Sequence, residues 1–314
     1  MYDLTGRKID YLRLSVTDLC NYRCIYCMGA DGVCKRSHRD ILTIEELSEI
    51  GRAAVACGVR KIRLTGGEPL VRRGILNLCR MLRQLDGLKE LTLTTNGSAL
   101  PRMAAELKAA GVDRLNISLD TLNEEMFRTV TRRGDLHEAL DGLAAAEAAG
   151  FTGTKLNTVL LGGINVGEIG ALAELTRKRP ISLRFIELMP IGVCADWPRE
   201  RFISADTVLQ ALPQLQRVGD DGVAELYRVP GWAGTVGLIR PMSRCFCDRC
   251  SRIRVTADGR LKPCLHSERE IPLRGLRGAA LEQAIRDAAA VKPESHHLTE
   301  RRSDSARNMN EIGG

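Results

Sequence analysis

An alternation of strand, loop and helix from residue 11 to about residue 190 constrains the fold of this chain more than any other feature. Short β-rich runs predict six strands, over Tyr11–Val16, Lys61–Thr65, Glu90–Thr95, Arg114–Leu119, Lys155–Leu160 and Ser182–Glu187. Amphipathic stretches between them predict helices over Thr43–Cys57, Arg72–Gln84, Pro101–Ala110, Leu136–Ala149 and Val166–Arg177. Because six β/α units are too few for a closed eight-fold barrel, we expect an α/β fold, a partial (β/α)6 barrel of the TIM type.

Local signals place the ends of several helices. Thr43 followed by Glu46 is a capping-box pattern, and Asn165 ahead of Glu168 is a looser one. Glycine is favoured at the position just beyond the end of a helix, and Gly58, Gly111 and Gly150 occupy this position after three of the predicted helices.

The alternation stops after about residue 195, which predicts a barrel core over residues 1–195 and a cysteine-rich C-terminal region over 196–314 that closes the barrel. Within that region, Arg217–Tyr227 predicts a hairpin around Gly219-Asp220-Asp221-Gly222. The polar tail Lys292–Gly314 is expected to be loosely held, apart from Met309 and Ile312.

Composition narrows the classes of partner. The chain has no uncharged apolar run of the roughly 18 residues that a membrane span needs, and charged residues precede any signal-like core, so we expect a cytoplasmic protein. Arginine supplies 37 of the 46 basic residues, and its planar fork suits phosphate, although genome composition explains the same bias. No compact basic block alternates with aromatic residues, so a nucleic-acid partner is not expected.

Eleven cysteines in a chain without an export signal indicate metal or redox chemistry rather than a disulfide framework. Seven of them gather near residues 20–27 and 245–264. The other four are expected to pack as small apolar side chains, at Cys34, Cys57, Cys79 and Cys194.

The first cysteine group, Cys20-x3-Cys24-x2-Cys27, follows the first predicted strand directly. Three thiolates on one loop can hold three irons of a [4Fe–4S] cube and leave the fourth iron open. Zinc is the alternative, but a structural zinc site needs a fourth ligand, which Cys34 or His38 would have to supply.

Two motifs together are similar to those of the radical S-adenosylmethionine superfamily. They are the cysteine loop with Tyr26 before its last cysteine, and Thr65-Gly66-Gly67-Glu68-Pro69 after the second strand. The resemblance implies that S-adenosylmethionine chelates the open iron. One electron from the reduced cluster then releases a 5′-deoxyadenosyl radical, and the protein supplies orientation and exclusion of solvent.

A second group, Cys247-x2-Cys250-x13-Cys264, encloses the run from Ser251 to Leu261 and resembles the C-terminal motif of the GTP 3′,8-cyclase family. Further matches to that family follow in order, at 94–97, 116–120, 184–190 and Gly313-Gly314. The resemblance implies conversion of GTP to (8S)-3′,8-cyclo-7,8-dihydroguanosine 5′-triphosphate, the first step of molybdenum cofactor biosynthesis. Hydrogen abstraction at ribose C3′ would be followed by attack on guanine C8.

The resemblance also implies roles for individual residues. The two [4Fe–4S] clusters would be held by Cys20, Cys24 and Cys27 and by Cys247, Cys250 and Cys264. S-adenosylmethionine would contact Tyr26, Gly67, Ser118 and Met189. GTP would contact Arg13, Arg63, Thr94, Lys155, Arg252, Ile253 and Arg254. Arg252, Arg254 and the Gly313-Gly314 tail would support catalysis inside the site. The implied partners are an electron donor, a second copy of the chain, and cyclic pyranopterin monophosphate synthase as the next enzyme.

Two alternatives remain at this point: a peptide-modifying radical enzyme with an auxiliary cluster, and a zinc-binding protein associated with nucleic acid. The former class usually carries more than three cysteines in its C-terminal region. The sequence also departs from the cyclase pattern at Gly29, where proline is common, and at Ser251, where asparagine is common. Cys245 adds a thiol that competes with Cys247 as a cluster ligand.

Overall fold

The computed structural model describes residues 1–33, 37, 39–298 and 303–313, and a sheet of twelve strands forms its centre. Six strands are β1 (Tyr11–Ser15), β2 (Lys61–Thr65), β3 (Glu90–Thr95), β4 (Arg114–Ser118), β5 (Lys155–Leu160) and β6 (Ser182–Glu187). The others are β7 (Gln216–Asp221), β8 (Ala224–Arg228), β9 (Thr235–Ile239), β10 (Arg252–Val255), β11 (Arg260–Lys262) and β12 (Ile271–Pro272). The first six agree with the predicted strands to within one residue.

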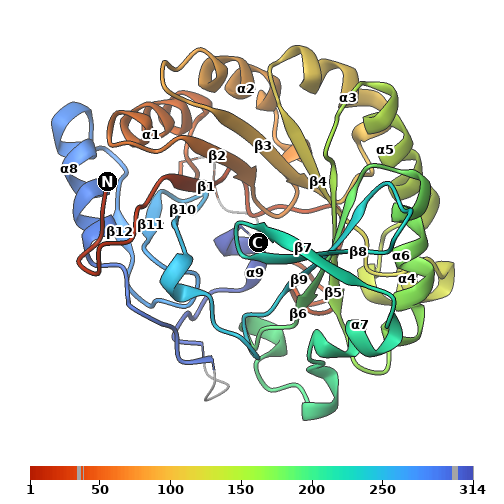
Figure 1. Cartoon of the computed structure of the whole chain (residues 1–314). Coiled ribbons are helices and arrows are strands. Elements are labelled where there is room, and N and C mark those ends of the chain that lie inside the picture. The colour runs from red at the N-terminus through yellow and green to blue at the C-terminus, as the bar shows by residue number, and fades with distance from the viewer. Residues whose placement is uncertain (34–36, 38, 299–302, 314) are drawn as a thin grey trace.

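The sheet order is β12-β11-β10-β1-β2-β3-β4-β5-β6-β9-β8-β7. The strands from β10 through β1–β6 to β9 are parallel, and antiparallel strands continue both edges. The sheet is curved, and most of the helices lie on its outer side (Figure 1). The predicted partial barrel is therefore confirmed. The C-terminal region lengthens it at both edges, where β10 lies beside β1 and β9 beside β6.

Helices of at least one turn alternate with these strands. They are α1 (Ile44–Ala56), α2 (Ile75–Arg83), α3 (Leu100–Ala109), α4 (Glu124–Thr131), α5 (Leu136–Ala148), α6 (Ile169–Lys178), α7 (Asp206–Ala211), α8 (Gly278–Ala290) and α9 (Met309–Ile312). Both α2 and α6 begin three residues later than predicted. Gly74 adopts a left-handed backbone at the N-cap of α2, and a 3-10 turn over Val166–Glu168 precedes α6.

One of the two predicted helix caps is confirmed. The Thr43 hydroxyl accepts from the Glu46 amide at 3.2 Å, and the Glu46 carboxylate accepts from the Thr43 amide at 2.9 Å. The cap at Asn165 is wrong, because its side chain instead donates to the Asp120 and Val159 carbonyls and accepts from the Leu161 amide. Asn165 therefore ties the end of β5 to the loop after β4.

Alternation along the strands separates an apolar outer layer from a polar interior. In β1, Leu12 and Leu14 pack into the hydrophobic core beneath the helices, whereas Tyr11 and Arg13 line cavities inside the barrel. The same rule directs Arg63 inward from β2. Among the described residues, no helix is long and apolar enough to cross a membrane.

The tail is held more firmly than predicted. The Arg307 guanidinium pairs with Glu270 at 2.6 Å and with Asp258 at 3.0 Å. The α9 helix after it carries its own capping box, and Ile312 is 1% exposed. The exception expected for Ile312 is therefore confirmed. The expectation of a loosely held tail is wrong around Arg307, because its ion pairs to distant segments compensate for the polar composition.

Candidate active site

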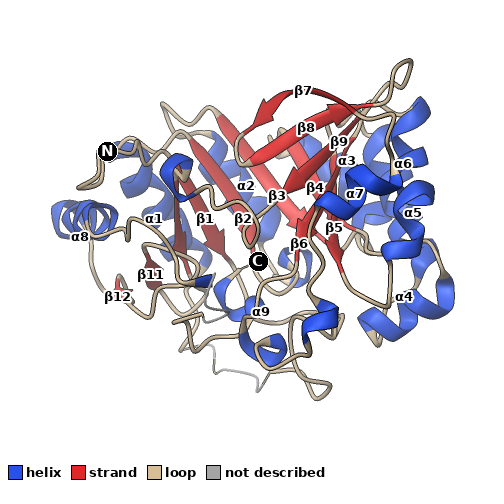
Figure 2. Ribbon diagram, turned by 60° about the horizontal axis from the view of Figure 1, so that its bottom comes forward, coloured by secondary structure: helices blue, strands red, loops and turns tan. Residues whose placement is uncertain are grey.

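Two adjoining cavities run through the barrel. The larger, of about 280 Å³, lies at the carboxyl ends of the strands and is lined by the loops after β1 and β2. The smaller, of about 210 Å³, lies at their amino ends, where Tyr11, Lys61 and Lys155 begin their strands. Arg13 and Arg252 line both cavities. Figure 2 shows α9 and the β7–β8 hairpin at opposite ends of the strands.

The first cysteine loop is fixed by α4, a helix that the sequence analysis did not predict. The amides of Arg23 and Ile25 donate to the carbonyls of Thr131 and Val130, each at 2.9 Å. Arg132, whose φ is +59° at the C-cap of α4, donates from its guanidinium to two carbonyls of the loop at 3.0 Å. This support holds the loop against the larger cavity, and Asn123 with two glutamates after it was the missed signal for the helix.

All three thiols of this loop line the larger cavity. Burial raises the pKa of Cys20 to about 11 and that of Cys27 to about 12, and it raises the pKa of Cys24 well above its ordinary value. A metal centre must displace these protons, because thiolates and not thiols bind metal.

The two glycines after β2 let the second loop pack directly on the first. A Cβ atom at Gly67 would lie 2.4 Å from the Leu19 carbonyl oxygen, and one at Gly66 would lie 2.5 Å from the Thr17 oxygen. The Gly67 amide donates to the Thr17 carbonyl at 2.8 Å. The glycines therefore serve close approach between two backbones, and this approach places Gly67 at the wall of the cavity.

The predicted S-adenosylmethionine residues come together in the same cavity. Tyr26, Gly67, Ser118 and Met189 all line it. The Tyr26 hydroxyl donates to the Asp120 carboxylate at 2.6 Å, and Asp120 also accepts from the Val159 amide at 2.8 Å. This fixed tyrosine lies between two cysteines of the first loop.

The second cysteine triad lines the same cavity as the first. Cys247 begins a 3-10 turn, Cys250 ends it, and Cys264 follows β11. Burial alone would raise the pKa of Cys250, but the cations Arg252 and Lys292 lower it to about 6. Lys292 also donates to the carbonyls of Arg252 and Pro263, at 2.8 and 2.9 Å, which joins the two segments that carry the triad.

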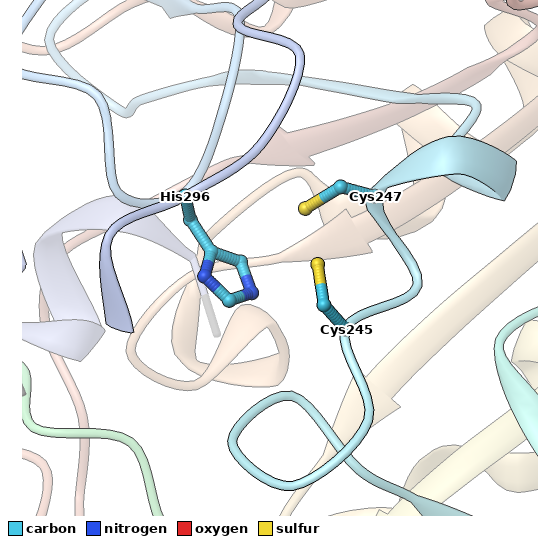
Figure 3. A group of neighbouring side chains, drawn as sticks. All are labelled: Cys245, Cys247 and His296. Atoms are coloured by element: carbon cyan, nitrogen blue, oxygen red, sulfur yellow. The ribbon is translucent and has the colours of Figure 1, made fainter. Parts of the chain in front are cut away.

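Cys245 differs from the three cysteines of the second triad. Its sulfur, that of Cys247 and a ring nitrogen of His296 all lie within 4.8 Å of one another (Figure 3). Such spacing suits a single ion, whereas a [4Fe–4S] cube fills the space between its thiolates and keeps them apart. Cys245 is exposed and outside the cavity lining, whereas Cys247 lines the cavity. Cys247 as the cluster ligand stays a prediction.

Cations concentrate in the smaller cavity. Four predicted GTP residues line it, namely Arg13, Arg63, Lys155 and Arg252. Burial lowers the pKa of Arg63 to about 9, and burial together with Arg184 lowers that of Lys155 to about 7. Arg184 also lines this cavity but was not among the predicted GTP residues, although alternation along β6 turns it inward as alternation along β2 turns Arg63 inward.

Several buried polar atoms around these cavities have no hydrogen-bond partner among the residues that the structure describes. They include Arg13 Nε, Thr94 Oγ1, both amide atoms of Asn116 and Arg184 Nε. An unsatisfied buried polar group costs about 1–3 kcal/mol. These donors and acceptors therefore fit a polar, anionic ligand such as a nucleotide.

Of the remaining predicted GTP residues, Thr94 and Arg254 line the larger cavity. Ile253 is fully buried in the hydrophobic core and lines neither cavity, because alternation in β10 turns its side chain outward. Only the main chain of Ile253 is available to a ligand.

The tail reaches the interior between β1 and β2. The Gly313 carbonyl accepts from Arg254 at 2.7 Å, and Met309 and Asn310 line the larger cavity. Gly313 has a φ of +78°, and a Cβ atom there would lie 2.4 Å from Thr65 Oγ1. Only glycine fits this position without displacing a neighbour. Gly314 lies outside the described residues.

The scattered cysteines agree with their predicted packing role where they are described. Cys57, Cys79 and Cys194 are buried. Cys34 and His38, the candidate fourth ligands of a zinc site, lie outside the described residues.

Comparisons with known proteins agree with this arrangement. Residues 14–176 match the Radical SAM superfamily, and residues 181–298 match Molybdenum Cofactor Synthesis C. The proteins named GTP 3′,8-cyclase from Peptoclostridium acidaminophilum and Alkaliphilus oremlandii are 49% and 46% identical to the chain. Each alignment covers all of this chain and, respectively, 98% and 100% of the relative.

Solved structures support the fold alone. Streptococcus suis SuiB has a TM-score of 0.63 at 14% identity, over 94% of this chain and 68% of its own. Methylornithine synthase has a TM-score of 0.51 at 16% identity, over 65% and 62% of the two chains. The superfamily match covers more than half of the chain, and the relatives named GTP 3′,8-cyclase align with all of it. The chain therefore belongs to the radical SAM superfamily and, within it, to the GTP 3′,8-cyclase family.

Proposed function

We propose that this protein converts GTP to (8S)-3′,8-cyclo-7,8-dihydroguanosine 5′-triphosphate, the first step of molybdenum cofactor biosynthesis. One observation carries the proposal: two cysteine triads line a single cavity that continues into a second, cation-lined cavity. The larger cavity can hold the reactive cofactor beside the nucleoside, and the smaller, cation-lined cavity can hold the triphosphate. Relatives that share the whole length of the chain carry the name of this activity.

The donor sets fit the two groups that this activity requires. Cys20, Cys24 and Cys27 would hold one [4Fe–4S] cluster and leave an iron for S-adenosylmethionine. Together these groups supply hydrogen-atom abstraction at ribose C3′. Tyr26 and Gly67 would orient S-adenosylmethionine, since both lie at the cavity wall beside the cysteine loop. Ser118 and Met189 complete this wall from β4 and the loop after β6.

The second triad would hold a cluster whose open iron binds the guanine base. Cys250 precedes β10 and Cys264 follows β11, the antiparallel partner of β10, so a base held there would lie beside Arg252 and Arg254. Arg254 also holds the Gly313 carbonyl, which couples the tail to the reacting nucleotide.

Triphosphate recognition is assigned to the cations of the smaller cavity. Arg13 and Arg252 line both cavities and would bridge the nucleoside and phosphate portions. Arg63, Lys155 and Arg184 are buried deeper, and among the described residues Arg184 Nε has no hydrogen-bond partner, so this donor could serve a phosphate oxygen. Arginine forks favour bidentate pairing with phosphate, so a triphosphate should bind more tightly than shorter chains.

The peptide-modifying alternative is not favoured. SuiB shares the barrel at 14% identity, which carries no functional argument. The full-length relatives at 46–49% identity bear the cyclase name instead.

The family resemblance also suggests a localisation, an oligomeric state and partners for this protein. We expect a cytoplasmic homodimer that receives electrons from a separate donor. Its product would pass to cyclic pyranopterin monophosphate synthase.

Anaerobic incubation of the cluster-loaded protein with GTP, S-adenosylmethionine and a strong reductant tests the function. We expect 5′-deoxyadenosine and the cyclised triphosphate by mass spectrometry, and neither without reductant. A Cys264→Ala control should make no cyclised product. Cofactor cleavage by the wild type with GTP left unchanged would refute the proposal, and protein that binds zinc and no iron under reconstitution would do so as well.

A further inference from the structure

The β7–β8 hairpin places a carboxylate directly on the buried cations of the smaller cavity. Asp221, the last residue of β7, accepts hydrogen bonds from Lys155 of β5 and Arg184 of β6 through the same oxygen, Oδ2. Lys155 and Arg184 are 4% and 6% exposed, whereas the Asp221 side chain is 44% exposed. A solvent-facing acid therefore neutralises two cations that the barrel buries.

The tip of this hairpin contacts the barrel through side-chain hydrogen bonds rather than through backbone pairing with β9. β8 pairs with β9 from Glu225 to Tyr227, so Asp221 and the turn after it lie beyond the last paired residue of β9. Asp221 contacts the barrel wall, and Asp220 contacts Arg249 at 3.3 Å. The predicted hairpin is thus confirmed, with its turn at Gly222 and Val223, two residues later than the expected centre.

Charge at this site is unbalanced. The cavity lining contains four arginines besides Arg184, two lysines and only two carboxylates, Asp10 and Asp221. Burial alone would raise the pKa of Asp221, but Arg184 and Lys155 lower it to about 2, so it is ionised at neutral pH. From outside the lining, Glu90 pairs with Lys61 and Asp220 pairs with Arg249. Among the described residues, Arg13, Arg63 and Arg252 have no carboxylate partner, and a polyphosphate would compensate their charge.

We propose that Asp221 is an internal counter-ion that occupies a phosphate position on Lys155 and Arg184 and is displaced when a polyphosphate enters the cavity. This inference rests on the proposed function, because it assigns the polyphosphate to the triphosphate of the substrate. The Asp221 carboxylate and a phosphate oxygen compete for the same two donors, and their negative charges repel each other. A ligand with one phosphate gains less on displacing Asp221 than a ligand with three, so Asp221 increases selectivity for the triphosphate.

The test compares Asp221→Asn with Asp220→Asn as the matched control. Asp220 is in the same strand, does not line the cavity and pairs with Arg217 and Arg249. Arg249 lines the cavity, but its side chain is 50% exposed, so its pair with Asp220 is screened by solvent. Inorganic tripolyphosphate is the probe, and its binding to the full-length, cluster-loaded protein is measured by calorimetry. We expect Asp221→Asn to tighten binding by about tenfold, because a competing charge-assisted hydrogen bond is weakened. The same variant should lower the melting temperature without ligand, while Asp220→Asn changes affinity less than about twofold.

A displaced counter-ion is indicated if Asp221→Asn has a lower melting temperature without ligand and a higher affinity for tripolyphosphate. Weaker tripolyphosphate binding by Asp221→Asn would mean that Asp221 positions the cations in the bound state, and would overturn the proposal. Unchanged affinity, or an equal gain in Asp220→Asn, would also overturn it.

Hydrogen–deuterium exchange of the wild type keeps the test decisive if Asp221→Asn does not fold. Tripolyphosphate should increase exchange in the hairpin tip, residues 219–224, and decrease it in β5 and β6. Protection of the tip would contradict displacement.

The two proposals can fail separately. Tripolyphosphate contains no guanine or ribose, so its binding does not depend on cyclisation. Tighter tripolyphosphate binding by Asp221→Asn without GTP turnover by the wild type would overturn the cyclase function alone. GTP turnover by the wild type with no gain of affinity in Asp221→Asn would overturn the counter-ion alone.

Discussion

Gly313→Ala should release the tail from the barrel and abolish most cyclisation while leaving the fold intact. The new methyl group would lie 2.4 Å from Thr65 Oγ1 and 3.0 Å from Ser15 Cβ. Thr65 and Ser15 are 1% and 0% exposed, so neither can move into solvent. The left-handed backbone costs a non-glycine residue roughly 1–2 kcal/mol, and overpacking adds about 1–3 kcal/mol.

The free energies that hold the tail in place are similar in size to the cost of the substitution. Burial of Ile312 contributes about 1.5–3 kcal/mol, and the hydrogen bond from Arg254 to the Gly313 carbonyl about 1.5–3 kcal/mol. A penalty of about 2–5 kcal/mol, the sum of the two costs of substitution, therefore shifts a large fraction of molecules to an undocked tail. The cysteine triads belong to other segments, so cluster content and global melting temperature should change little.

Three measurements check this expectation: hydrogen–deuterium exchange over residues 309–313, iron content, and cyclised product. Gly231→Ala is the matched control, because Gly231 also has a positive φ, of +82°, but nothing lies within 4 Å of its Cβ position. It should keep its activity. Full activity and an equally protected tail in Gly313→Ala would refute the reasoning.

Other expectations follow from the same site. Cys20→Ala should stop cleavage of S-adenosylmethionine, whereas Cys264→Ala should keep some uncoupled cleavage and lose cyclisation; product analysis separates them. Cys245→Ala should retain about eight irons per chain and Cys247→Ala should fall towards four, as iron assay will show if each triad holds a complete cube. Burial and Arg184 lower the pKa of Lys155 to about 7, and a bound triphosphate would restore its charge. Lys155 should then take up a proton when the triphosphate binds at pH 8, and the affinity should fall as the pH rises. Calorimetry in two buffers with different ionisation enthalpies measures this proton uptake, which should be absent in Lys155→Gln.

Local patterns were sufficient to predict the barrel core. The inner and outer faces of β1 and β2 follow from the alternation of Arg13 with Leu12 and of Arg63 with Leu64. The two cysteine loops could be located because their spacing is a local property. α4 also has a local signal, because Asn123 followed by two glutamates is typical of a helix start.

Long-range pairing could not be predicted in the same way. No local feature of β10 specifies that Arg254 aligns with Arg13 of β1, about 240 residues earlier. The tail looked loose because the partners of Arg307 lie 37 and 49 residues away. The resemblance implied four residues of the smaller cavity, but no local pattern gave its position. The general rule for parallel β/α folds places sites at the carboxyl ends of strands, whereas Lys155 and Asp221 meet at the amino ends.

The open edge of the barrel explains how one chain can join these parts. β10 adds to the sheet beside β1, which continues the row of inward cations from Arg63 through Arg13 to Arg254. Cys247 and Cys250 precede this strand and Cys264 follows β11, its antiparallel partner, so the backbone hydrogen bonds of the sheet help to fix the second triad relative to the first. A closed eight-fold barrel would have no free edge beside β1 for that strand to join. The incomplete barrel thus brings the second cysteine triad, the phosphate cations and the glycine tail to one interior, with the first cysteine loop at its mouth.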